Sequence, residues 1–128
     1  MRVIDAGVVL EILVGRLEPA SLGDQDLAVP HLIDSEVAHA LRGLVRRGTL
    51  SDAEGALAMA RFAQLILTRC PADWLRERIW ELRDNLNGYD ATYVALAEML
   101  DATELLTTDA RLARAPGPRC RIRLLPRG

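Results

Sequence analysis

Four carboxylates stand at positions that lie at the ligand-binding edge of an α/β sheet. Asp5 and Asp109 each follow a short apolar segment, whereas Glu36 and Asp90 stand at or near the start of predicted helices. In an open parallel sheet, the C-terminal ends of strands and the N-terminal ends of the following helices share one edge, where ligands bind. Each acid taken alone is also explained as a helix cap or a solvated side chain. Together they predict a single acidic site.

Convergence of four carboxylates is electrostatically costly. Two such groups about 5 Å apart repel each other by roughly 3 kcal/mol at an effective dielectric constant near 20. Protonation at raised pKa values would offset this repulsion, and so would a divalent cation. Oxygen ligands without cysteine or histidine favour Mg²⁺ or Mn²⁺ over zinc. A site of that kind suits metal-assisted hydrolysis of a phosphodiester.

Other chemistries are poorly supported. Glu36 and His39 have the spacing of a di-iron ligand pair, but that site needs a second copy, which the sequence lacks. All 16 basic residues are arginine, so mechanisms that need a lysine are excluded, including the P-loop and the Schiff base. Cys70 and Cys120 have no metal-binding or redox spacing, and we expect both to be buried thiols.

The predicted elements alternate between strands and helices. Short apolar runs predict strands at 2–5, 27–30, 104–107 and 121–125, and residues 65–67 are either a strand or the end of a helix. Apolar residues at helical spacing predict helices at 8–13, from an Asp34-Ser35 cap to Gly48, from a capping box at Ser51 to about 63, from Asp73 to 86, at 90–100 and from Asp109 to 112. The helix at 90–100 is apolar nearly all round, so it should be central.

The length and composition fit one globular domain. The chain has 128 residues, half of them hydrophobic, so it can build a core without disulfides or a structural metal. Alternating strands and helices predict an α/β fold over residues 1–128, with a mostly parallel sheet flanked by helices. No apolar run is long enough to span a membrane, and a cytoplasmic location is expected.

Four segments resemble the PIN-domain family, and within it the VapC-type toxins of bacterial toxin–antitoxin pairs. They are VIDAGVVLEIL at 3–13, SEVAHALR at 35–42, GYDATYVALAEML at 88–100 and LLTTDARL at 105–112. They occur in the family's order and cover essentially the whole chain. The resemblance implies a twisted parallel sheet, Mg²⁺- or Mn²⁺-dependent endoribonuclease activity and neutralisation by a cognate antitoxin.

The resemblance also implies roles for particular residues. By position, the family's catalytic and metal-binding acidic quartet falls on Asp5, Glu36, Asp90 and Asp109. Thr107 matches a threonine whose hydroxyl would orient the last acid or a metal-bound water. Gly7 departs from the family, which often has serine or asparagine there. Glycine cannot make the hydrogen bond that a serine or asparagine side chain would make here. Its presence therefore implies a lower metal affinity, or a backbone N–H that makes this hydrogen bond instead.

Partners follow from the same comparison. Arg42, Arg46, Arg111 and Arg114 are candidates for contacting RNA phosphates, or they form a solvated helix face. The antitoxin would lie against the helices at 34–67, where the apolar stretch 50–67 forms its groove, a homodimer surface or ordinary core. Apart from the four quartet acids, 14 acidic residues face 16 arginines, so a formal charge of −2 does not exclude RNA.

Two other functions compete with this one. A PIN-like module could bind RNA or protein without cutting it, and the complete quartet argues against that alternative. An aspartate-nucleophile phosphoryl-transfer enzyme would need a lysine, or an Asp-x-Asp motif at the first strand, where Gly7 stands instead.

Overall fold

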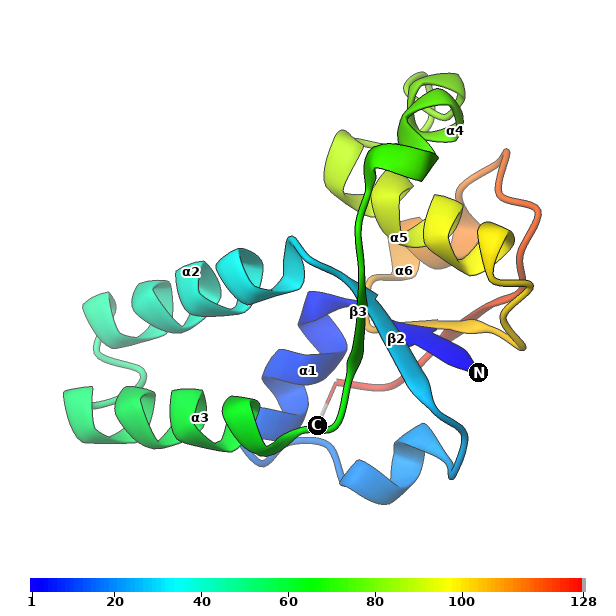
Figure 1. Ribbon diagram of the computed structural model, residues 1–128. Helices are drawn as coiled ribbons and strands as arrows, with labels where there is room; N and C mark the ends of the chain where they lie inside the picture. Colours follow the sequence, from blue (N-terminus) through cyan, green and yellow to red (C-terminus); the bar gives the residue numbers. More distant parts are fainter. Residues whose placement is uncertain (128) are drawn as a thin grey trace.

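The computed structural model describes residues 1–127 as a five-stranded parallel sheet with helices on both sides (Figure 1). The strands are β1 (Arg2–Ile4), β2 (Leu27–Pro30), β3 (Thr68–Cys70), β4 (Leu105–Thr107) and β5 (Ile122–Leu124). The helices are α1 (Ala6–Leu13), α2 (Ile33–Arg46), α3 (Asp52–Gln64), α4 (Arg76–Glu81), α5 (Gly88–Met99) and α6 (Ala110–Arg114), with 3₁₀ turns at Pro19–Leu22 and Asp73–Leu75. The predicted α/β fold is confirmed.

The strand order β3-β2-β1-β4-β5 puts β1 at the centre of the sheet. Val3 lies beside Ala28 of β2 on one side and beside Leu105 of β4 on the other. The direction of the chain therefore reverses across β1, and such a switch point is where open α/β sheets bind ligands. Asp5 immediately follows β1, so the strand order places it in the middle of that edge.

Helix α5 is the most deeply enclosed helix. All residues from Ala91 to Ala97 are buried, and the helix packs against β1, β2 and β4. Its nearly uniform apolar surface predicts this central place, because a helix that is apolar all round must be covered on every side. A rigid, covered α5 fixes the position of its own first turn, where Asp90 stands.

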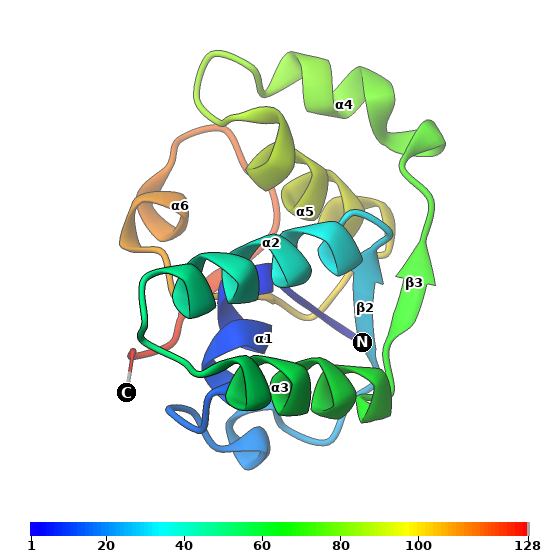
Figure 2. The same cartoon turned by 90° about the vertical axis from the view of Figure 1, so that its left-hand side faces the viewer.

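Helices α2 and α3 form an antiparallel hairpin that extends away from the sheet, with α1 packed against both (Figures 1 and 2). The predicted capping box opens α3: Ser51 Oγ accepts from the Glu54 N–H, and Glu54 accepts from the Ser51 N–H. Gly48 turns the chain between the two helices with φ +78°, a conformation that favours glycine.

One predicted helix cap is wrong, and the alternative explanation of Asp90 as a helix cap is excluded. α2 begins at Ile33 rather than after Asp34-Ser35, because Ile33 is fully buried under the helix. Asp34 then lies inside the first turn, where it forms a bidentate pair with Arg69 at 2.7 and 2.8 Å. Likewise, Asn87 caps α5 and leaves the Asp90 carboxylate outside the cap.

Two further expectations concern residues 65–67 and the cysteines. Of the two alternatives for residues 65–67, the structure has the end of a helix, because Leu65 is the C-cap of α3 and Ile66 is 94% exposed. The third strand follows at Thr68–Cys70, where none was predicted. Cys70 and Cys120 are half-buried free thiols rather than buried ones, because they lie in or beside edge strands that are only partly covered.

Candidate active site

Asp5 is the buried centre of the candidate site. Its side chain is the N-cap of α1, where Oδ1 accepts the Val8 N–H at 3.0 Å, and the Thr107 hydroxyl donates to Oδ2. The residue is 8% exposed. Burial raises the pKa of Asp5 to about 6; the two hydrogen bonds lower it, and the charges of Asp90 and Asp109 raise it further.

Thr107 connects two of the acids. Its hydroxyl donates to Asp5 and accepts the backbone N–H of Asp109 at 3.0 Å. Asp109 in turn caps α6, and its Oδ1 accepts the Arg111 N–H at 2.9 Å. The expected contact with the carboxylate of the last acid, Asp109, is not formed: the hydroxyl donates to the carboxylate of Asp5 and meets only the backbone N–H of Asp109.

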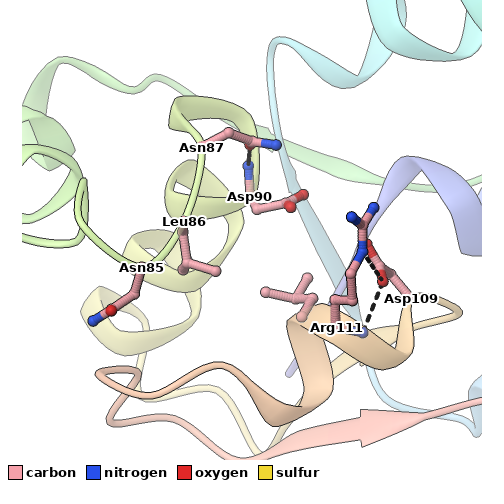
Figure 3. Close-up of a pocket in the computed structure, with 7 residues that line it drawn as sticks. Asn85, Leu86, Asn87, Asp90, Asp109 and Arg111 are labelled. Atoms are coloured by element: carbon pink, nitrogen blue, oxygen red, sulfur yellow. Dashed lines mark hydrogen bonds and ion pairs between the residues drawn. The ribbon is translucent and has the colours of Figure 1, made fainter.

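Asp90 faces Asp109 across a small cavity. Both carboxylates line a hollow of about 210 Å³, into which Figure 3 shows them pointing from α5 and from the loop after β4. Burial raises the pKa of Asp90, the charge of Asp109 raises it further, and the nearby Arg111 lowers it. The Arg111 Nε lies 3.9 Å from Asp109 Oδ1, so this guanidinium partly offsets the negative charge of the pair.

Glu36 completes the group from the first turn of α2. The hydroxyl of Tyr93 donates to Glu36 Oε1 at 2.7 Å. Burial raises the pKa of Glu36, the hydrogen bond from Tyr93 lowers it, and the charges of Asp90 and Asp5 raise it. Asp5, Glu36 and Asp90 each have a pKa that is raised in part by the charge of another acid of this group, although the four acids come from four different parts of the chain.

Tyr93 is a further residue of the site, and its role was not predicted from the sequence. Its ring is 1% exposed in the core of α5, and only its hydroxyl reaches Glu36. Two signals in the sequence point to it: Tyr93 follows Asp90 by three residues, which puts both on one helix face, and it carries a polar group in an otherwise apolar helix.

The carboxylates could hold a divalent ion only after some side-chain movement. Within residues 1–127, no three Asp, Glu, His or Cys side chains are placed so that together they could ligate an ion as they stand. The donors nevertheless suit Mg²⁺ or Mn²⁺, because all are carboxylate oxygens and three of the acids have pKa values raised by burial and mutual repulsion. A cation would relieve that repulsion.

Gly7 is explained by its neighbour. A Cβ at this position would lie 2.8 Å from Thr108 Oγ1 and 3.5 Å from Asp5 Oδ1. The space that a side chain would need is thus filled by a hydroxyl from the loop after β4. The bond from the Val8 N–H to Asp5 Oδ1 is the N-cap bond of α1, so the two expected consequences of Gly7 stay predictions.

The four candidate phosphate-binding arginines are all exposed, as Arg42 and Arg46 on α2 and Arg111 and Arg114 on α6. Arg42 and Arg46 border a groove between α2 and α3, whereas Arg111 lines the cavity of Asp90 and Asp109. Among residues 1–127, the structure has no helix that combines the length and the apolar character needed to cross a membrane.

The fold and the cluster of acids at the sheet edge define a PIN domain, and the family model described as "PIN domain" matches residues 2–118. The chain belongs to this family. It is 44% identical over 128 residues to Ribonuclease VapC9 of Mycobacterium tuberculosis, an alignment that covers 99% of this chain and 100% of the relative. It is 42% identical to Ribonuclease VapC1 of the same organism, covering 96% of each. Within the PIN domains, it is therefore a member of the VapC group.

Solved structures agree with this fold. VapBC2 from Rickettsia felis, crystallised with a DNA fragment from its promoter, matches with a TM-score of 0.70 at 10% identity, covering 97% of this chain and 98% of that one. VapC20 of Mycobacterium tuberculosis, described as a Sarcin-Ricin loop cleaving toxin, matches with a TM-score of 0.66 at 13% identity, covering 88% and 93%. At these identities the likeness concerns the fold alone.

Proposed function

We propose that this protein is a Mg²⁺- or Mn²⁺-dependent endoribonuclease and the toxin of a toxin–antitoxin pair. The observation that carries the proposal is the convergence of four carboxylates at the switch point of the sheet, with pKa values raised for Asp5, Glu36 and Asp90. The names of the VapC relatives, which describe ribonucleases, support the same reaction class.

Asp5, Asp90 and Asp109 would hold the ion directly or through water, and Glu36 would complete the site. A bound divalent ion lowers the pKa of an attacking water and neutralises charge on the scissile phosphate. Thr107 keeps Asp5 and the start of α6 in register through its hydroxyl. Asp90 and Asp109 line the cavity in which the phosphate would lie.

Glu36 is the best placed proton acceptor. Tyr93 holds its Oε1, which leaves Oε2 available to take a proton from the attacking water. The pKa of Glu36 is raised toward neutral pH, and a general base is most effective when its pKa lies near the pH at which the enzyme works. The RNA phosphates on either side of the scissile one would be contacted by the exposed Arg42, Arg46, Arg111 and Arg114.

The antitoxin is expected on the α2–α3 hairpin. A groove of about 290 Å³ lies between these helices, and Leu57 and Met59 of α3 are exposed beside the buried positions of the same helix. A partner segment that covers this groove could also bring a basic side chain to the acids. The same apolar surface suits a homodimer contact, so the assembly is either a homodimer or a toxin–antitoxin hetero-oligomer.

The test uses purified protein with single-stranded and structured RNA in the presence of Mg²⁺, Mn²⁺ or EDTA. Cleavage should require either ion, and both Asp5→Asn and Asp90→Asn should abolish it. Cleavage that survives either substitution would show that the site is elsewhere. RNA binding without cleavage under every condition would favour the alternative, a PIN-like module that binds RNA or protein without cutting.

A further inference from the structure

A second hollow adjoins the acidic site on the side of α2. It has a volume of about 600 Å³ and is lined by Ser35, Glu36, His39 and Tyr89. Its size is typical of sites that take small ligands. Only Glu36 belongs to the acidic group, and the smaller cavity of Asp90 and Asp109 has a different lining. The two hollows therefore offer separate places for two parts of one substrate.

Tyr89 gives this hollow an aromatic surface. It is 64% exposed, in contrast to Tyr93 one turn later in α5, which is 1% exposed. The exposed ring contributes little to the core, and it directly precedes Asp90 in the first turn of the helix. An aromatic ring held beside a nuclease site offers a stacking surface for an unpaired base.

The chemistry of the lining favours a base over a phosphate. Glu36 forms part of the wall, and its carboxylate would repel a phosphate group that lacks a bound cation. The Ser35 hydroxyl and the His39 imidazole supply a donor and an acceptor suited to the polar edge of a base. A flat, uncharged group with a polar edge fits this combination.

We propose that this hollow receives a nucleobase next to the scissile phosphate, stacked on Tyr89 and contacted at its edge by Ser35 and His39. The inference rests on the proposed ribonuclease function, because the phosphate beside that base must reach the acidic group. The proposal adds three residues, Tyr89, Ser35 and His39, that would bind a base, a role for which the acidic quartet has no suitable groups.

The exposed surface of α2 continues from this hollow. Ser35, His39, Arg42 and Arg46 follow one another by four, three and four residues, the spacing of a single helix face, and all four are exposed. A strand with one base in the hollow would bring its further phosphates to Arg42 and Arg46. The base subsite therefore lies between the acids and a basic stripe, as a bound single strand requires.

Binding can be measured without cleavage in the Asp90→Asn background. Short fluorescein-labelled single strands of A, C, G or U are titrated in Mg²⁺, and anisotropy gives the Kd of each. Adding Tyr89→Ala should weaken the tightest of these by about tenfold or more, whereas Tyr89→Phe should keep it within about twofold. Trp80→Ala, which removes an exposed aromatic ring on α4, is the matched control and should leave the Kd unchanged.

An abasic strand of the same length separates stacking from backbone contacts. It should bind more weakly, and its Kd should be the same with Tyr89 or with alanine at that position. Equal Kd values for the background protein and the Tyr89→Ala variant on all four strands, or no binding of any strand, would overturn the subsite. Binding that depends on Tyr89, combined with a parent protein (Asp90 intact) that cleaves no RNA in Mg²⁺ or Mn²⁺, would instead refute the proposed nuclease function and leave the subsite standing.

Discussion

Replacing Asp5 by asparagine should stabilise the metal-free protein at neutral pH. Folding moves this carboxyl from water into a site where it is 8% exposed, and its pKa rises from 3.8 to about 6. Between these two values the folded state binds more protons than the unfolded state, so Asp5 makes stability fall as pH rises through this window. Asparagine has no charge to bury and removes this dependence.

The size of the effect follows from the two pKa values. Linkage predicts that the raised pKa of Asp5 lowers the free energy of unfolding by roughly 0.5 kcal/mol at pH 4, about 1.5 kcal/mol at pH 5 and about 3 kcal/mol at pH 7. The hydrogen bonds from Thr107 and Val8 lower this pKa, so their stabilisation of the ionised carboxylate is already contained in these values. The gain on replacing ionised Asp5 by a neutral asparagine is therefore about 3 kcal/mol at pH 7.

The assay is urea unfolding of both proteins in EDTA at several pH values from 4 to 7.5. The free energy of unfolding of Asp5→Asn minus that of the parent should increase by about 2.5 kcal/mol over this range. Asp24→Asn, which neutralises an exposed carboxylate outside the helices and strands, should give a nearly constant difference. A flat difference for Asp5→Asn, or one that decreases with pH, would refute the argument that burial destabilises this charge.

Three further outcomes concern the same neighbourhood. Mg²⁺ or Mn²⁺ should raise the melting temperature of the parent protein and EDTA should reverse the rise, whereas Asp5→Asn should respond only weakly; an equal rise in both would remove Asp5 from the ligand set. Thr107→Val should lower the Mn²⁺ affinity measured by calorimetry about tenfold and Thr107→Ser should restore it, because the hydroxyl joins Asp5 to the backbone N–H of Asp109; equal affinities of the two variants would contradict this. Gly7→Ser should destabilise the protein in urea by about 1–3 kcal/mol, since its Cβ would lie 2.8 Å from Thr108 Oγ1, and Thr108→Ala in the same chain should recover most of the loss; additive losses would refute the steric explanation.

Local patterns predicted the elements well where one strong signal acted alone. The capping box at Ser51 and the apolar surface of α5 gave their helices directly. The prediction failed where a distant residue competed with the local signal. Asp34 pairs with Arg69, which is 35 residues away, instead of capping α2. The edge strand β3 forms at Thr68–Cys70, where the local pattern predicted no strand.

The sequence by itself determined which groups are the candidates for the chemistry. Asp5, Glu36, Asp90 and Asp109 follow strands or open helices, and in a parallel sheet those positions meet at one edge whatever the details of packing. The absence of lysine restricted the basic contacts to arginine. Both conclusions depend only on residue type and on short-range periodicity, so one sequence was enough to reach them.

Only the tertiary structure decided how these groups are held and charged. The hydroxyl of Tyr93 reaches Glu36 from 57 residues away, and that of Thr107 reaches Asp5 across 102 residues. Thr108 fills the space beside Gly7 in the same long-range manner. Burial and the approach of like charges set the pKa of Asp5, and neither is encoded in local spacing. Contacts of this kind depend on how separate elements pack. The positions of the candidate acids could therefore be predicted from the sequence, but the groups that surround them could not.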